Sequence, residues 1–283
     1  SVSTTVLVPS KSDSLRVLRS LADSRVVKVR YLPGISDLWL RDPAPWLVMS
    51  NNAKWLWQPE FDPPYLSAEP QLKSNRAVLE SFFRKSLSGF NCDHLTLQLD
   101  WKWEGGNATF NGAGVIIATD AVLLQNHGTQ SGLEQVCRAL GARPIIIPAE
   151  PGDVLSHSDG TVRFWYHDEI LISDLTGVPG LSASARRKAE NYLDQLVDVL
   201  TANGFLEERI KLVPCGPYAE RSGLDGIPSA RGCYINYLRT RDLILVPAFG
   251  DRKQDQKALE FFHSIQSPRG RVVPIDCRLL SDF

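Results

Sequence analysis

The sequence alternates short runs of β-forming residues with helical patterns, and this alternation limits the fold more than any other feature. The runs are rich in Val, Ile, Leu and aromatic residues, which favour strands. The predicted strands are residues 4–8, 26–31, 46–49, 115–118, 145–147, 162–166, 170–172, 210–213, 243–246 and 271–275. The predicted helices are residues 13–21, 75–90, 132–140, 184–203 and 254–264. Strand pairs that alternate with helices indicate the α/β class.

The predicted helix at residues 184–203 carries the clearest apolar stripe. Tyr192, Leu193, Leu196, Val197 and Leu200 follow one another at helical spacing, so they share one face. We expect that face to pack against the sheet strands.

The strand–strand–helix–strand order recurs about every 50 residues, although the residues themselves do not repeat, and such a period suggests a solenoid, a propeller or an array. No low-complexity stretch or long linker divides the chain. The Pro-rich patch at residues 59–70 is short enough to be an active-site loop. We therefore predict a single domain over residues 1–283.

Charge and cysteine content narrow the class of partner. A formal net charge of −1 excludes a dominant electrostatic partner such as nucleic acid or an anionic membrane surface.

The five cysteines are an odd number without a Cys-x-x-Cys pair, which argues against a disulfide framework and for the reducing cytoplasm. No His or Cys pair has metal-ligand spacing, so we expect no metal and no cofactor. Homo-oligomerisation stays open.

The first polar segment, residues 37–45, contains Trp39, Arg41 and Asp42 just before Pro43. A residue before proline is driven to an extended conformation, which ends any helix there. An acid beside a tryptophan can bind a cation, with the ring as a flat wall. The alternative is an Arg41–Asp42 turn on the surface.

The second polar segment, residues 101–112, places Glu104 before a Gly105–Gly106 pair. Glycines let another group approach the backbone closely. The segment lacks the Lys-Ser/Thr ending of a phosphate loop, so phosphate binding is not expected. A glycine-rich hairpin turn is the alternative.

The third and fourth segments supply a histidine, a carboxylate and an amide. His157 and Asp159 precede a predicted strand, and in an extended chain residues two apart point to the same side. They would then place a base that titrates near neutral pH beside a carboxylate. Asn236, within residues 232–237, is either a buried amide that orients a substrate or an ordinary turn or edge residue.

Taken in order, these motifs resemble one enzyme family. The five motifs are Trp-x-Arg-Asp-Pro, Glu-Gly-Gly-Asn, His-x-Asp-Gly, Tyr-Ile-Asn-Tyr and Pro-x-Phe-Gly-Asp. They begin at residues 39, 104, 157, 234 and 247, respectively. The set resembles agmatine deiminase and the bacterial peptidylarginine deiminases, from about residue 32 to the last residue. The resemblance implies the pentein fold, a five-bladed α/β propeller with pseudo-fivefold symmetry and a central active site.

The resemblance also implies a role for each residue. Asp42 and Asp159 would bind the guanidinium nitrogens, which offer N–H donors in a fixed planar fork. Trp39 would line the substrate stem, Glu104 would hold His157, and Asn236 would bind the substrate. A cysteine thiolate would attack the guanidinium carbon, ammonia would leave, and water activated by His157 would hydrolyse the thiouronium intermediate.

The sequence departs from the family at the nucleophile. The family's Gly-Gly-x-x-His-Cys segment follows the strand that corresponds to residues 271–275, and the given sequence stops before it. Cys277 comes too early and is read as a small buried residue. A missing C-terminal tail is the favoured explanation, and a guanidinium-binding relative without the nucleophile is the alternative.

The substrate is expected to be a small guanidino compound or a peptidyl arginine. Residues 55–65 contain Glu60 and Asp62 but no arginine, which favours a cationic tail such as that of agmatine. Arg221 or Arg231 could instead meet the carboxylate of an arginine substrate. An amidinotransferase of the same superfamily is the alternative reaction.

Overall fold

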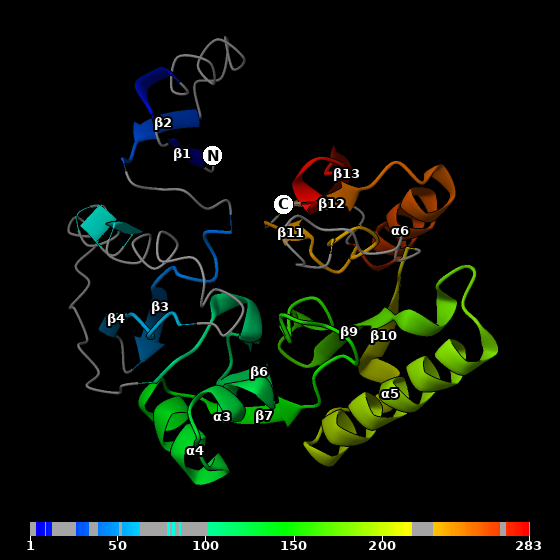
Figure 1. The fold of residues 1–283 in the computed structure, drawn as a ribbon, viewed down its shortest axis with the longest axis horizontal. Coiled ribbons are helices and arrows are strands. Elements are labelled where there is room, and N and C mark those ends of the chain that lie inside the picture. Colours follow the sequence, from blue (N-terminus) through cyan, green and yellow to red (C-terminus); the bar gives the residue numbers. More distant parts are fainter. Residues whose placement is uncertain are drawn as a thin grey trace. The chain divides into compact units, whose positions relative to one another are not determined.

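The computed structural model describes residues 4–8, 10–12, 27–33, 39–50, 53–62, 78–79, 81–82, 85, 101–216, 229–240, 242–266 and 270–282. The fold is α/β (Figure 1). The chain divides into two compact units, Ser1–Gly105 and Gly106–Phe283, and each is described by itself. The predicted helix 13–21 and most of the predicted helix 75–90 lie outside the described residues.

The described residues of the first unit form two small sheets. Strands β1 (Thr4–Val8) and β2 (Val27–Tyr31) pair in parallel, and β3 (Trp46–Ser50) and β4 (Ala53–Trp57) form an antiparallel hairpin. The strands predicted at 4–8, 26–31 and 46–49 are confirmed. The β4 strand was missed because its sequence shows no strict alternation of apolar and polar residues.

An aromatic cluster stabilises the β3–β4 hairpin. Trp46 lies opposite Trp57 in the ladder, with ring centroids 5.0 Å apart in an edge-to-face arrangement. Trp103 completes the cluster at 5.2 Å from Trp46, and both Trp57 and Trp103 are buried. Such edge-to-face pairs add stabilisation beyond the burial of their area. Trp103 therefore fixes the chain immediately before Glu104.

The second unit repeats one topology three times. Each sheet has two antiparallel strands, then a helix, then a third strand parallel to the second. The sheets are β5 (Thr109–Phe110), β6 (Val115–Thr119) and β7 (Arg143–Ile147); β8 (Val162–Tyr166), β9 (Glu169–Asp174) and β10 (Ile210–Pro214); and β11 (Leu238–Arg239), β12 (Leu243–Ala248) and β13 (Arg271–Asp276). The predicted strand–strand–helix–strand order is confirmed in this unit.

Helices provide the crossovers that parallel strands need. The connections contain α3 (Ala121–Gln125) with α4 (Gln130–Ala139), then α5 (Ala183–Ala202), then α6 (Arg252–Ile265). Each of the three longer helices begins at a residue whose side-chain oxygen accepts a backbone N–H of the first turn. These caps are Thr129, Ser182 and Asp251.

The main core of the second unit lies beneath α5, which runs alongside β9 and β10 (Figure 1). Tyr192, Leu196 and Leu200 of its apolar stripe are buried, and Leu193 and Val197 pack at the margin. The predicted stripe is therefore confirmed. The stripe packs against isoleucines and valines of β6 to β9. Of these strands, β6 and β9 are buried along almost their whole length, which indicates that both of their faces are covered.

A second core lies around α6 and the third sheet. Ala258 and Phe262 of the helix pack with Ile244 and Val246 of β12.

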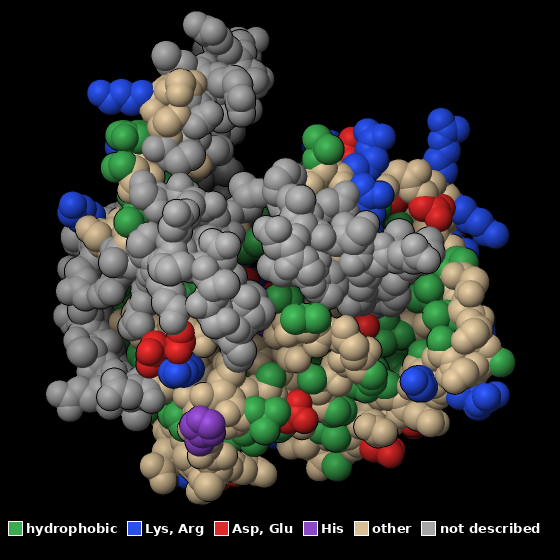
Figure 2. Space-filling model, in the orientation of Figure 1, with side chains coloured by type: hydrophobic (Ala, Val, Ile, Leu, Met, Phe, Trp, Pro, Cys, Tyr) green, Lys and Arg blue, Asp and Glu red, His purple; other side chains and the backbone are tan. Residues whose placement is uncertain are grey.

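On the face shown in Figure 2, basic and acidic side chains are both present among apolar ones. Among the helices of the described residues, none combines the length and the apolar character that a membrane span requires.

The α5 packing predicts the cost of a truncation. Leu196 is 1% exposed in the core, so Leu196→Ala should lower the free energy of unfolding by about 2–5 kcal/mol through lost burial and a cavity. The matched control is Leu206→Ala, since Leu206 is 59% exposed and its truncation should change stability by less than about 0.5 kcal/mol. Urea unfolding of both variants measures the difference. Equal losses would contradict this packing.

Candidate functional site

In the first unit, the Glu104–Gly105 turn lies against the Arg41–Asp42 segment. The Gly105 N–H donates to the Asp42 carbonyl at 3.1 Å, and the Arg41 Nε donates to the Gly105 carbonyl at 3.0 Å. A Cβ added to Gly105 would lie 2.0 Å from the Arg41 carbonyl oxygen, so only glycine fits there. The structure thus brings together two motifs that the sequence separates by more than sixty residues. Of the two predicted acids, Glu104 is buried and Asp42 is half-buried.

Trp39 and Asp42 belong to the same tight turn. The Asp42 N–H donates to the Trp39 carbonyl at 3.3 Å, and Gln58 Nε2 donates to the carbonyl of the buried Pro43 at 3.0 Å. Trp39 is 43% exposed, so much of its side chain is accessible. An accessible indole ring can form the apolar or cation–π wall of a binding site, so the role predicted for Trp39 stays a prediction.

In the second unit, His157 and Asp159 lie in a turn that precedes β8, and Asp159 is half-buried. His157 is 9% exposed and Ser158 is fully buried. The Asp159 N–H donates to the Gly106 carbonyl at 3.0 Å, so the turn is attached to the second glycine of the pair. The Ser158 carbonyl accepts the N–H groups of Thr161 and Val162. The chain therefore turns at Ser158 instead of running extended, and the same-side placement of His157 and Asp159 stays a prediction.

Asn236 is exposed, so of the two alternatives the turn residue is confirmed and the buried amide is wrong. The Asn236 N–H donates to the Cys233 carbonyl at 3.3 Å in a turn before β11. The neighbouring Tyr234 and Tyr237 take the buried positions. The same segment reaches the third motif, since the Cys233 thiol lies 3.5 Å from the Gly160 carbonyl.

The comparisons with known proteins identify the family. A family model described as Porphyromonas-type peptidyl-arginine deiminase matches residues 2–282, and so covers all five motifs. The chain belongs to this family.

Curated and solved relatives agree with this peptidyl-arginine deiminase family. Agmatine deiminase of Medicago truncatula is 29% identical over 195 residues, which are 61% of this chain and 51% of that protein. The chain thus spans about half the length of this curated relative. The resemblance drawn from the motifs is confirmed.

Two solved agmatine deiminases share the fold. The C. jejuni enzyme superposes with a TM-score of 0.72 at 17% identity, covering 99% of this chain and 77% of that chain. The Enterococcus faecalis enzyme superposes with a TM-score of 0.73 at 18% identity, covering 98% of this chain and 79% of that chain.

In this deiminase-family chain, Cys277 has the setting of a structural cysteine. Its N–H donates to the Ala248 carbonyl at 2.9 Å, which attaches the turn after β13 to the end of β12. Burial raises the pKa of the Cys277 thiol above its ordinary value. A nucleophilic cysteine needs the opposite shift, because the thiolate is the reactive form. Cys277 is half-buried instead of fully buried as expected.

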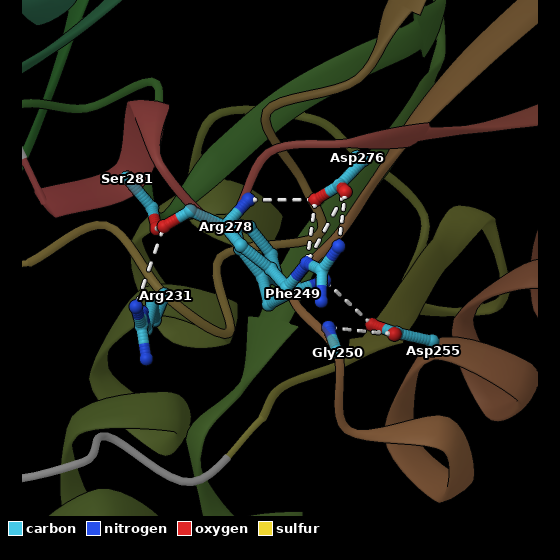
Figure 3. A network of polar contacts seen from close by, with 7 residues as sticks. All are labelled: Arg231, Phe249, Gly250, Asp255, Asp276, Arg278 and Ser281. Carbon is cyan, nitrogen blue, oxygen red and sulfur yellow. Dashed lines mark hydrogen bonds and ion pairs between the residues drawn. The ribbon is translucent and has the colours of Figure 1, made fainter.

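A polar network surrounds this turn (Figure 3). The Arg278 Nε and Nη2 donate to the two carboxylate oxygens of Asp276 at 2.9 and 2.6 Å, and the Arg278 side chain passes over Gly250. The hydrogen bonds from Arg278 lower the pKa of Asp276 to about 2. Asp255 accepts the N–H groups of Phe249 and Gly250, so it fixes the Phe-Gly-Asp motif.

Two predicted substrate contacts are engaged elsewhere. Arg231 Nη2 donates to the Arg278 carbonyl at 3.3 Å, which attaches Arg231 to the C-terminal turn (Figure 3). Asp62 forms an ion pair with Lys102 at 2.9 Å, so its charge is already compensated. Arg221 lies outside the described residues. Within the described part of the chain, no group of three or more His, Cys, Asp or Glu is arranged to hold a metal ion.

Sequence reasoning missed the residues that support these motifs. Asp255 and Tyr234 form one pair, with the Tyr234 hydroxyl 2.8 Å from the Asp255 carboxylate. Thr119 and Asn107 form another pair, in which the Thr119 backbone N–H donates to Asn107 Oδ1 at 2.8 Å. The Pro-Ala-Phe-Gly-Asp motif, followed by an acid one helical turn after its last residue, was the only signal that could have pointed to Asp255.

The contact between Gly105 and Arg41 predicts a steric effect. Gly105→Ala should lower the free energy of unfolding by at least about 2 kcal/mol, because the methyl group must displace the Arg41 backbone. Gly112→Ala is the matched control. Gly112 has φ +71° and open space around it, so only a conformational cost of about 1–2 kcal/mol applies. Denaturant unfolding of both variants tests this, and an equal or smaller loss for Gly105→Ala would contradict the close approach.

The Tyr234–Asp255 pair predicts a pH effect. Burial, together with Asp255, raises the pKa of Tyr234, so the folded state holds the phenolic proton more tightly than the unfolded state. The stability that this proton contributes is fully present below about pH 10, the pKa of tyrosine in the unfolded chain. It is lost as pH rises through the higher pKa that Tyr234 has in the folded state. Tyr234→Phe keeps the ring contact with Phe249 and should weaken the alkaline loss of stability. Urea unfolding between about pH 8 and 11 measures it. An unchanged pH slope would refute the linkage.

Proposed function

We propose that this protein hydrolyses a guanidinium group to a ureido group and ammonia. The observation that carries the proposal is the family match over residues 2–282, which contain every motif residue named above. The hydrogen bonds around the glycine pair add support. Gly105 binds the backbone of Asp42, and the next residue, Gly106, binds the backbone of Asp159. In each unit, the acid-bearing segment is thus held by a backbone hydrogen bond to one glycine of the pair.

The two carboxylates are proposed to bind the substrate. Asp42 and Asp159 would accept hydrogen bonds from the guanidinium N–H groups, and charge-assisted bonds of this kind are roughly twice as strong as neutral ones. Trp39, with its partly exposed ring, would line the apolar stem. Asn236, which is exposed, would donate or accept at the substrate's far side.

The chemistry is proposed to proceed in two steps. A thiolate, from the cysteine that the resemblance places after β13, adds to the guanidinium carbon, and His157 donates a proton to the amine that leaves as ammonia. Water then adds to the thiouronium carbon while His157 accepts its proton, and cleavage of the C–S bond releases the ureido product. Glu104 would hold His157, and its burial suits a carboxylate that orients an imidazole without binding substrate.

Agmatine is the proposed substrate class, and arginine or a peptidyl arginine is the alternative. The relatives compared above are named agmatine deiminases, which supports agmatine. The acids near residue 60 support it less than expected, because Asp62 is paired with Lys102. Arg231 is attached to the C-terminal turn, which weakens the case for a substrate carboxylate at that position.

We also propose a single five-bladed domain. Among the described residues, the strands form separate small sheets, two in the first unit and three in the second. The three sheets of the second unit share one topology, and the two solved relatives match nearly the whole chain. The working compartment is proposed to be the cytoplasm, on the cysteine pattern alone.

An amidinotransferase and a non-catalytic guanidinium-binding relative are the competing functions. An amidinotransferase passes the amidine to an amine, so it needs an acceptor, whereas a deiminase releases ammonia in water alone. Incubation of the full natural protein with agmatine, arginine and an arginine peptide, with detection of ammonia and ureido product, separates the three. Ammonia release only in the presence of an added amine acceptor, or binding without turnover, would refute the deiminase proposal.

The carboxylate assignment predicts a loss of substrate binding. Asp42→Asn and Asp159→Asn should each reduce kcat/KM more than tenfold, because each removes a charge-assisted partner that contributes at least about 2 kcal/mol. Asp168→Asn is the matched control, since the Asp168 side chain is half exposed. Steady-state kinetics with agmatine measure the effect. Wild-type kinetics in either variant would remove that residue from the site.

The His157 assignment predicts a loss of turnover. His157→Ala should lower kcat by about 10²-fold or more, the usual scale for a general acid–base. KM should change much less than in Asp42→Asn, because His157 does not bind the guanidinium. His167→Ala is the control, because the side chain of His167 is 70% exposed. A variant that loses affinity but keeps kcat would make His157 a binding residue.

A further inference from the structure

Thr119 lies fully buried at the end of β6, and the proposed chemistry gives it no role. Its backbone N–H donates to Asn107 Oδ1 at 2.8 Å. Asn107 is itself buried and ends the short 3-10 turn Gly105–Asn107. The end of β6 is therefore attached to the turn whose Gly106 carbonyl binds Asp159.

The Thr119 hydroxyl reaches the residue that precedes His157. It donates to the Ser156 carbonyl at 2.6 Å, across 37 residues of sequence. Ser156 has φ +54°, a left-handed conformation that residues other than glycine rarely adopt. A strained residue persists only where its surroundings hold it. The buried hydroxyl of Thr119 provides such a hold next to the proposed acid–base.

The same strand holds the residue after His157. The Ser158 hydroxyl donates to the carbonyl of Ile117 at 3.3 Å, and Ile117 precedes Thr119 by two positions in β6. Strand β6 therefore binds the chain on both sides of His157, at Ser156 through Thr119 and at Ser158 through Ile117. Because β6 is buried along its whole length, both anchors lie within the core and not on an exposed loop.

We propose that Thr119 is a positioning residue that sets the orientation of His157 by fixing Ser156 in its left-handed conformation. The catalytic part of this statement rests on the proposed deiminase function. Thr119 does not touch substrate, so its loss should misplace His157 without weakening substrate binding. A misplacement of about 1 Å at a reacting group can cost as much as 10²-fold in rate.

Two variants of the full natural protein separate the hydroxyl from the shape of the side chain. Thr119→Val removes the hydroxyl and keeps the size, and it should lower kcat by about tenfold or more while KM stays within about twofold. Thr119→Ser keeps the hydroxyl and should restore most of the activity. Thr201→Val is the matched control, because the Thr201 hydroxyl binds the Val197 carbonyl at 2.9 Å within α5. It should behave as wild type.

A second measurement does not depend on activity. The ring-proton signals of His157 in NMR spectra, assigned by their absence in His157→Gln, should shift in Thr119→Val and return in Thr119→Ser. Circular dichroism and Tm report whether each variant folds, and Thr119→Ala replaces Thr119→Val if valine beside the Ser156 carbonyl prevents folding.

The outcomes keep the two proposals apart. Unshifted His157 signals in the folded Thr119 variant would overturn the positioning role, whatever the activity. A fall in binding with kcat unchanged would overturn it as well. A wild-type protein that releases no ammonia from agmatine, arginine or an arginine peptide would overturn the deiminase function instead, and the His157 signals would then decide the positioning role alone.

Discussion

The backbone of the Gly105–Gly106 pair is the constraint on which the acid-bearing segment of each unit depends. The first glycine comes so close to the Arg41 carbonyl that no side chain fits, and its N–H binds the Asp42 carbonyl. The second binds the Asp159 N–H. Backbone groups buried in this way must be paired, since an unpaired one costs about 1–3 kcal/mol. The backbones of both acid-bearing segments are therefore positioned by hydrogen bonds.

Buried strand β6 carries the groups that hold the turn with His157. Its five residues are all buried between the hairpin partner β5 and the parallel partner β7, and Ile117 belongs to the core beneath α5. Hydroxyl and carbonyl groups at its end hold Ser156 and Ser158. The core that stabilises the fold and the turn that carries His157 thus share one strand.

The sequence predicted the repeating elements because burial leaves a periodic trace. The apolar runs of β6, β9 and β12 and the stripe on α5 are such traces, and each matches a buried element. The two-residue strands β5 and β11 are too short to show a period, and they were missed. The order of the motifs in the sequence predicted the site residues. It did not predict the residues that hold them, because a residue such as Thr119 binds a residue 37 positions away. The sequence left the burial of Asn236 open, because two buried tyrosines flank this exposed amide.

The repeated topology of the second unit has a consequence for how the chain reaches its native state. Each of its three sheets is made from one uninterrupted stretch, Thr109–Ile147, Val162–Pro214 or Leu238–Asp276. A sheet of this kind needs no strand from elsewhere in the chain, so the loop-closure entropy for its pairing is modest. During synthesis each sheet can pair as soon as its third strand leaves the ribosome. The turn that carries His157 cannot reach its final form until β6 has been made, and β6 always comes first.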